Sequence, residues 1–370
     1  MKLIFAISIS LLMLIAANQV SAAMRKAPYV TFAGTNTEMV VHWQLTTTEP
    51  CTFAWGTDTS CAAGSRQTAE YGGDHQHRYT VSGLVPGGNY YYRVTDGPQR
   101  YTGSFRAAPA DSATTLKFIA YGDTRSDPMT HNAVADAIAT TFTRDSAYHT
   151  MVISGGDLVA DGNKDSNWDN ELFNPAFTHI QYMLANLPYQ SCVGNHEGTG
   201  SLFAKYFSYP FVAHHYWSFD YCPAHFAVLD QYTGYGPGSA ELAWLTKDLA
   251  TSSKPWKFIL LHEPGWSAGG DHKNNVSVQT YIQPLCEQYH VSIVFGGHNH
   301  YYARAVVNGV EHITTGGGGA PMYKPNATDP HIVATSMTHH FCTVAIDSTV
   351  LHFTAITLNG AVIDTFSMTR

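Results

Sequence analysis

The side chains best suited to chemistry in this chain follow short apolar runs, at the point where each run ends. The run Val152-Ile153-Ser154 continues through two glycines into Asp157, and four other runs end in comparable polar residues. Together they offer carboxylate, amide and imidazole groups but no thiolate: Asp123, Asp157, Asn195, His262, His298 and His300. Such donors suit zinc, iron or manganese. Two ions about 3.5–4 Å apart need a bridging carboxylate, and Asp157, in the middle of the set, is the expected bridge.

These donors have to be positioned by strands. From Leu116 onward the apolar runs alternate with helix-like segments, which predicts helices over residues 129–143, 239–250 and 278–289. Open α/β sheets bind ligands beyond the carboxyl ends of their strands, which is where the six donors would lie. We therefore predict a layered α/β domain over residues 115–370, with sheets packed face to face and helices outside.

Residues 27–108 have a different pattern, with short alternating strands separated by turns and no helical period. This pattern predicts an all-β sandwich. The stretch from Leu84 to Val94 resembles part of fibronectin type III-like domains. Small and polar residues from Ala107 to Thr115 are the expected linker between the two domains.

The first 22 residues are typical of a signal peptide. Lys2 precedes an apolar stretch from Leu3 to Ala17, and Val20-Ser21-Ala22 offers small residues before a cleavage point. The alternative is a membrane anchor, but this stretch is short for a span. We expect a secreted protein, extracellular or, in a bacterium, periplasmic. No later run is apolar and long enough to cross a bilayer, so no membrane span is expected after cleavage.

Charge and cysteine usage narrow the possible partners. The formal net charge is −8, and removal of residues 1–22 takes away one lysine and no acid, which makes it −9. A chain of this charge offers no evident surface for nucleic acid. Six cysteines allow about 15 pairings, and export makes disulfides plausible. Cys51 and Cys61 flank a turn-rich stretch and are the expected bridge; a metal site built from them is disfavoured, since no Cys-x-x-Cys spacing occurs.

The polar strand ends resemble the five ordered motifs of calcineurin-like metallophosphoesterases. With the sandwich in front and a glycine run behind, the closer resemblance is to purple acid phosphatases. The residues that carry it are Gly122-Asp123, Gly156-Asp157, Gly194-Asn195-His196-Glu197, His262, Gly297-His298-Asn299-His300 and the run from Gly316 to Pro321.

The resemblance implies two metal ions and a division of roles. One ion would be held by Asp123, Asp157 and His300. The other would be held by Asp157, Asn195, His262 and His298. His196 and His272 would face the phosphate of the substrate. Glu197 either orients His196 or caps a helix.

Two positions depart from the family patterns. Purple acid phosphatases have an iron-binding tyrosine three residues after the second aspartate, where this chain has Ala160. Other metallophosphoesterases have a histidine two residues after the first aspartate, where this chain has Arg125. The first metal site therefore has one protein ligand fewer than either pattern, which argues against ferric iron and a purple colour.

The resemblance implies a secreted phosphatase that hydrolyses small phosphate monoesters by attack of a metal-bound hydroxide, with iron, zinc or manganese as the two ions. A phosphodiesterase with the same metal centre is the first alternative. A non-catalytic extracellular binding module is the second, and the complete donor set argues against it.

Overall fold

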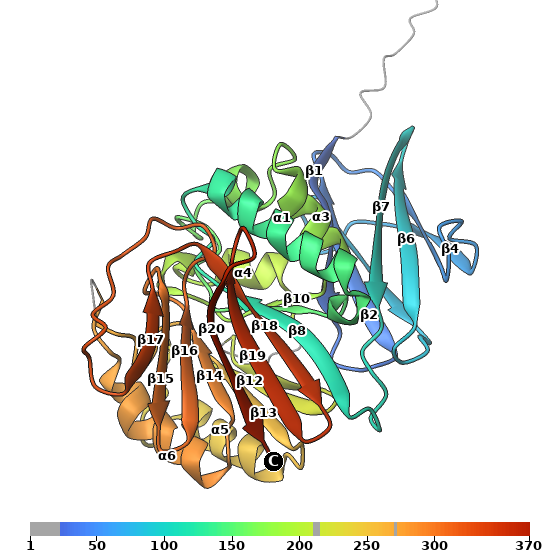
Figure 1. The fold of residues 1–370 in the computed structure, drawn as a ribbon. Helices are drawn as coiled ribbons and strands as arrows, with labels where there is room; N and C mark the ends of the chain where they lie inside the picture. The colour runs from blue at the N-terminus through green and yellow to red at the C-terminus, as the bar shows by residue number, and fades with distance from the viewer. Residues whose placement is uncertain (1–22, 210–214, 270–271) are drawn as a thin grey trace, which may run out of the picture.

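The computed structural model describes residues 23–209, 215–269 and 272–370, and the expected signal peptide lies outside these ranges. Figure 1 shows an all-β part at the N-terminus, beside a larger part in which sheets and helices form layers. This arrangement confirms the predicted fold class, an all-β domain followed by an α/β domain.

The N-terminal part consists of two antiparallel sheets. One contains β1 (Met24–Phe32), β2 (Glu38–Leu45) and β5 (Gln76–Ser82). The other contains β4 (Gly64–Thr68), β3 (Cys51–Gly56), β6 (Asn89–Asp96) and β7 (Gln99–Arg106). Trp43 of the first sheet stacks on Phe53 of the second at 5.8 Å between ring centroids, and both are buried. Alternate residues of each strand thus fill a core between the sheets, as in a sandwich.

The predicted bridge between Cys51 and Cys61 is wrong, because all six cysteines are free thiols. Cys51 begins β3 and its sulfur faces the core, where it accepts a hydrogen bond from Trp43 Nε1 at 3.4 Å. Cys61 lies in the turn beyond the other end of the same strand, close to the carbonyl of Thr59. The six-residue strand holds the two sulfurs apart.

The larger part contains two mixed sheets that pack face to face, as predicted. The first has the order β10-β9-β8-β18-β19-β20, formed by Tyr189–Ser191, Val152–Ser154, Thr115–Tyr121, His340–Asp347, Val350–Thr357 and Val362–Thr369. The second has the order β11-β12-β13-β14-β16-β15-β17, formed by Trp217–Tyr221, Ala224–Val228, Trp256–Leu260, Ile293–Gly296, Val310–Thr315, Tyr302–Val307 and Ile332–Ser336. Phe118 of β8 meets Phe226 and Phe258 edge-on across the layer between the sheets.

Helices cover the outer faces of this pair of sheets (Figure 1). α1 (Pro128–Arg144) and α3 (Thr178–Asn186) lie on the first sheet, whereas α5 (Ala240–Thr251) and α6 (Gln283–Gln288) lie on the second. The three predicted helices are present, although the last begins as the π-helix η4 and continues as α6. The short helical segments are η1 (Ser146–Tyr148), α2 (Asp165–Asn167), η2 (Trp168–Leu172), η3 (Asn195–Glu197), α4 (Ser201–Tyr206) and η4 (Val278–Ile282). Over the described ranges, no helix has the length and apolar character that a membrane crossing requires.

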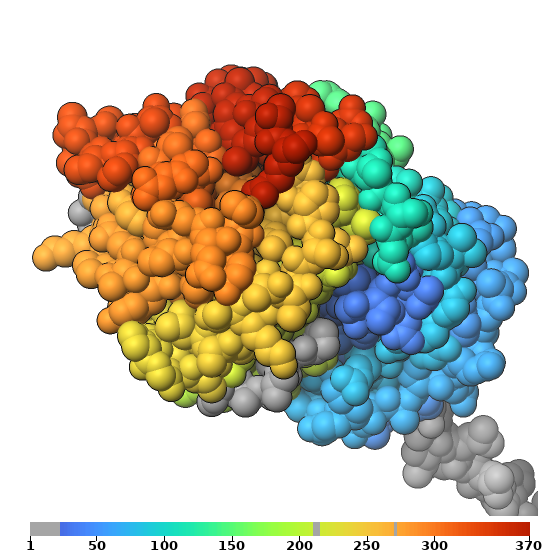
Figure 2. Space-filling model, turned by 90° about the horizontal axis from the view of Figure 1, so that it is seen from below, coloured from blue at the N-terminus to red at the C-terminus, as the bar shows by residue number. Residues whose placement is uncertain are grey.

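The two parts are packed against each other, as the space-filling view shows (Figure 2). Tyr92 Oη donates a hydrogen bond to the carbonyl of Ala185 at 2.8 Å, at the end of α3. The amide of Ser104 donates to Asn186 Oδ1 at 2.9 Å. Tyr29 Oη donates to the carbonyl of Tyr206 at 2.5 Å. These bonds fix the N-terminal domain on the side of α3 and α4.

Candidate metal centre

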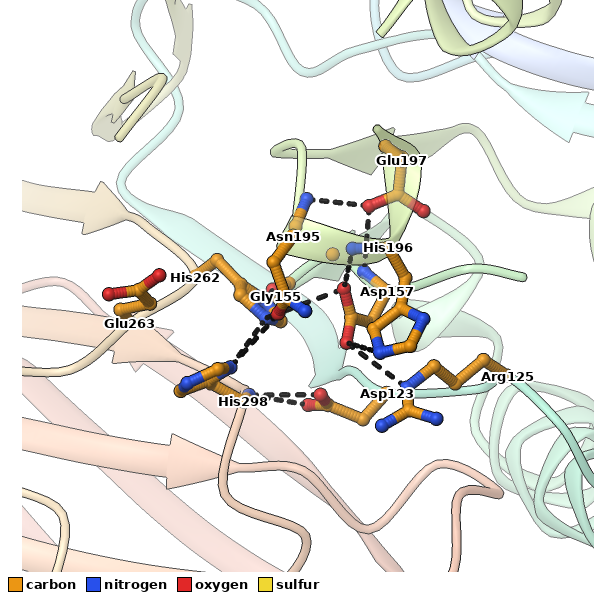
Figure 3. A network of polar contacts seen from close by, with 12 residues as sticks. Asp123, Arg125, Gly155, Asp157, Asn195, His196, Glu197, His262, Glu263 and His298 are labelled. Atoms are coloured by element: carbon orange, nitrogen blue, oxygen red, sulfur yellow. Dashed lines mark hydrogen bonds and ion pairs between the residues drawn. The ribbon is translucent and has the colours of Figure 1, made fainter. Parts of the chain in front are cut away.

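The six predicted donors come from loops that follow five strands of the two sheets. β8, β9 and β10 are parallel neighbours, and Asp123, Asp157 and Asn195 follow their carboxyl ends. The three histidines follow β13 and β14, which are parallel neighbours in the other sheet. The loops approach so closely that a Cβ on Gly155 would lie 3.0 Å from the amide nitrogen of Gly297. The glycines in these motifs therefore bring the two sheets' loops together at one site, part of which Figure 3 shows.

Three of these residues have a strained backbone. Asp123, Asp157 and His298 have φ angles of 58°, 54° and 68°, in the left-handed region that non-glycine residues rarely adopt. The Asp123 amide donates to the carbonyl of Gly156 at 3.0 Å, and the His298 amide donates to both carboxylate oxygens of Asp123 at 2.9 and 3.0 Å. Strain of this kind clusters at functional sites, where surrounding contacts maintain it.

The two aspartates are buried and have pKa values shifted in opposite directions. Burial, together with the nearby charge of Asp157, raises the pKa of Asp123 well above its usual value. Burial alone would raise the pKa of Asp157 as well, but His262 and His196 hold that pKa below its usual value. Two buried carboxylates this close repel each other when both are ionised, and a cation between them would remove that repulsion.

Hydrogen bonds to backbone carbonyls fix the tautomers of three histidines. Nδ1 of His262 donates to Gly155 O at 2.6 Å, and Nδ1 of His300 donates to Pro321 O at 2.7 Å. His196 Nδ1 donates to Ala160 O at 2.6 Å. A carbonyl can only accept, so in each neutral ring Nε2 carries a lone pair. Metal-binding histidines are oriented by outer hydrogen bonds of this type.

The Nε2 lone pair of His262 faces two acceptor oxygens and a ring nitrogen of His298. His262 Nε2 and His298 Nδ1 each lie 3.0 Å from Asn195 Oδ1 and 3.2 Å from each other. His262 Nε2 also lies 3.4 Å from Asp157 Oδ1. Burial, with the neighbouring His262 and His272, lowers the pKa of His298 to about 3, so that this ring is neutral at pH 7. A cation would bind the His262 lone pair together with the Asn195 and Asp157 oxygens, so this donor set fits a metal ion.

The remaining donors form a second group beside the first. Single ligand atoms of Asp123, Asp157 and His300 lie within 4.8 Å of one another. His300 Nε2 is 3.6 Å from Asp123 Oδ1, and burial lowers the pKa of His300 to about 4. Asp157 takes part in both groups, as a bridging ligand would. These residues also fit a metal ion.

The structure places His196 and His272 next to these donors. His196 Nε2 lies 4.0 Å from Asp157 Oδ2, and its side chain is 28% exposed. The His272 ring lies 4.0 Å, centroid to centroid, from the ring of His298. Both rings therefore border the candidate metal donors.

The two departures from the family patterns have a visible consequence. Arg125 extends into the group formed by Asp123, Asp157 and His300: its Nε lies 3.2 Å from Asp157 Oδ2 and its Nη2 lies 3.4 Å from His300 Nε2. Ala160 presents no donor side chain, and its carbonyl orients His196 instead. A guanidinium therefore lies beside Asp157 and His300, carried by the position at which other metallophosphoesterases have a histidine.

Glu197 is a cap, the second of its two predicted roles. Its buried carboxylate accepts hydrogen bonds from the amides of Gly194 at 2.5 Å, Asp157 at 3.0 Å and Leu158 at 2.8 Å. It thereby ties the loop after β9 to the loop after β10 (Figure 3).

Sequence reasoning missed two residues beside the site. Tyr323 stacks on His300 with ring centroids 4.1 Å apart, and Glu171 binds backbone amides of two site loops. Neither belongs to a motif, so no local pattern signals them.

Comparison with known proteins identifies the family. A family model described as calcineurin-like phosphoesterase matches residues 116–302, half of the chain. The chain belongs to the calcineurin-like phosphoesterases. A second model, the N-terminal domain of purple acid phosphatases, matches residues 26–115. The family predicted from the motifs is confirmed, together with its closer similarity to purple acid phosphatases.

The chain is similar to several plant phosphatases of this family. Purple acid phosphatase 15 of Arabidopsis thaliana is 26% identical over 262 residues, 62% of this chain and 49% of that protein. Purple acid phosphatase 22 of the same plant is 28% identical over 271 residues, 66% of this chain and 58% of that protein. This chain spans about half the length of these relatives. The structure of a purple acid phosphatase from yellow lupin (Lupinus luteus) seeds has the same fold, with a TM-score of 0.77 at 19% identity, over 93% of this chain and 75% of that one.

Proposed function

We propose that the chain is a secreted phosphatase that hydrolyses small phosphate monoesters at a centre of two metal ions. One ion would be held by Asp123, Asp157 and His300, and the other by Asp157, Asn195, His262 and His298. The observation that carries the proposal is the convergence of metal-binding atoms: His262 Nε2, His298 Nδ1 and Asn195 Oδ1 lie 3.0–3.2 Å from one another. Zinc, iron and manganese suit such donors.

The chain's own residues would bind the phosphate and handle the leaving group's proton. When bound, the two ions would supply positive charge against the phosphate oxygens and lower the pKa of a water molecule. His196 and His272, at the border of the donor groups, would bind the equatorial oxygens. His196, partly exposed and fixed through Nδ1, is the better placed to hold a proton at Nε2 and donate it to the leaving alkoxide. The guanidinium of Arg125 adds a fixed positive charge beside the same oxygens.

Export and domain limits are part of the proposal. We infer that residues 1–22 act as a signal peptide, that residues 27–108 form the N-terminal domain and that residues 115–370 form the catalytic domain. N-terminal sequencing of the exported protein tests the first inference: a mature chain beginning at Ala23 supports it, and retention of Lys2 contradicts it.

Hydrolysis of a monoester and a diester with the same leaving group tests the reaction. With zinc, manganese or iron supplied separately, kcat/KM for 4-nitrophenyl phosphate should exceed that for bis(4-nitrophenyl) phosphate. The reverse order would make the protein a phosphodiesterase. Absence of both activities in metal-loaded protein would leave the binding-module alternative.

A further inference from the structure

Glu171 binds two active-site loops at once through a single oxygen. It lies on η2 (Trp168–Leu172) and is almost completely buried. Its Oε2 accepts hydrogen bonds from the amide of Ser126 at 2.8 Å and from the amide of Ala160 at 3.0 Å. Its Oε1 accepts from Asn167 Nδ2 at 2.7 Å. One carboxylate thus connects the loop after β8 to the loop after β9.

One of the two amides belongs to Ala160, which departs from the family patterns. The other belongs to Ser126, the neighbour of the second departing residue, Arg125. Ser126 follows Arg125 and has a φ of 71°, a strained value that needs support from its surroundings. Ala160 accepts the Nδ1 proton of His196 at 2.6 Å through its carbonyl. The position of the Ala160 peptide therefore sets the direction of the His196 ring.

The helix that carries Glu171 is itself fixed to the N-terminal domain. Lys26 of β1 is fully buried, and its Nζ lies 2.5 Å from Asp169 Oδ1. Arg25 Nε donates to Asp169 Oδ2 at 3.0 Å. On the other side of η2, Trp168 Nε1 donates to the carbonyl of Gly162 at 3.1 Å. A rigid support of this kind holds a functional side chain more accurately than a free loop does.

We propose that Glu171 is a positioning residue that sets the orientation of His196 and Arg125 toward the phosphate; this rests on the proposed phosphatase function. It acts through the peptide of Ala160 and the backbone of Ser126 and touches none of the six metal donors. Its loss should therefore lower turnover while the chain keeps its metal ions.

The chain offers matched variants because the two carboxylate oxygens have different partners. Glu171→Ala removes the acceptor for both backbone amides and should lower kcat by about 10–100-fold, the size of effect that a misplaced catalytic group produces. Glu171→Gln can keep an oxygen at the Oε2 position and donate from its NH2 group to Asn167 Oδ1 once the Asn167 amide has turned over, so kcat should stay within about threefold. Asn167→Ala removes only the Oε1 contact and should leave kcat within about twofold.

A double variant that combines Glu171→Ala with His196→Ala distinguishes a positioning role of Glu171 from a general loss of stability. If Glu171 acts through His196, Glu171→Ala should reduce kcat further by less than about threefold when His196 is already alanine. A multiplicative loss in the double variant would overturn the proposal. Glu171→Asp, which keeps the charge but shortens the side chain, gives the same comparison if Glu171→Ala does not fold.

Amide hydrogen exchange provides a test that does not depend on activity. Peptides covering residues 122–128 and 157–163 should exchange faster in Glu171→Ala than in wild type or Asn167→Ala. Unchanged exchange overturns the proposal, and so does faster exchange with unchanged kcat in an active enzyme. If the wild-type protein hydrolyses no phosphate ester, the proposed function fails, and the exchange result alone decides whether Glu171 positions the loops.

Discussion

Replacement of His196 by alanine should lower the rate of phosphate ester hydrolysis while the protein keeps its metal ions. The ring is fixed through Nδ1 by the Ala160 carbonyl at 2.6 Å, and Nε2 lies 4.0 Å from Asp157 Oδ2, beyond bonding distance. A positioned proton donor contributes about 10²–10⁴-fold in rate, equivalent to about 2.7–5.4 kcal/mol of transition-state stabilisation. The hydrogen bond that is lost contributes about 1 kcal/mol to folding, so the variant should remain folded.

Asp157→Ala is the matched opposite. Asp157 is 1% exposed and takes part in both donor groups, with Oδ1 3.4 Å from His262 Nε2. This variant should lose at least one metal ion per chain and essentially all activity. Metal analysis and steady-state kinetics of both variants, measured side by side, provide the assay. The loss in His196→Ala should appear in kcat if the ring acts in the transition state, and in KM if it only binds phosphate. Stoichiometric loss of metal from His196→Ala would refute the division of roles.

Three further variants test other parts of the structure. Arg125→His replaces the guanidinium beside Asp157 and His300 with an imidazole ligand. In a metal titration, the Kd for the weaker ion should be lower by about tenfold or more, equivalent to about 1.4 kcal/mol. An unchanged or higher Kd contradicts the assignment of Arg125 to that site. Burial alone would lower the pKa of His225, but hydrogen bonds to Asp220 and Asp248, both 2.7 Å, raise this pKa to about 9. The stabilisation is complete below the unfolded pKa of about 6.5 and is lost as pH rises through 9. The unfolding free energy of the wild type should therefore fall by about 2 kcal/mol over that window, a figure reduced because Asp220 is half exposed, and this fall should be absent in His225→Gln. Identical pH profiles of the two proteins would refute this prediction. Lys26→Met removes a positive charge that offsets the carboxylate of Asp169, and it should lower the unfolding free energy by about 2–4 kcal/mol in denaturant unfolding. The exposed control Lys247→Met should change this free energy by no more than about 0.5 kcal/mol. Equal effects of the two substitutions would contradict the importance of the buried pair.

The convergence of the six proposed donors could be predicted because each follows a buried strand in an ordered motif. Parallel strands place their carboxyl ends at one edge, so residues such as Asp123, Asp157 and His262 meet although long segments separate them in sequence. The sandwich and the layered domain could be predicted for a similar reason, since strand and helix periods are local properties of the chain.

Other features depend on contacts between distant segments, which no local pattern contains. The proposed Cys51–Cys61 bridge considered spacing alone, whereas β3 turns Cys51 into the core and away from Cys61. The three amides held by Glu197 come from two loops, so its role as a cap followed only from their packing. Glu171 reaches Ser126 across 45 positions of sequence.

An anomalous diffraction map from crystals of the exported protein loaded with manganese or zinc tests the central claim most directly. The account predicts two peaks about 3.5–4 Å apart, with the Asp157 carboxylate between them. Asn195, His262 and His298 should surround one peak, and Asp123 and His300 the other. A single peak, or two peaks that do not share Asp157, would contradict a centre of two metal ions bridged by this residue.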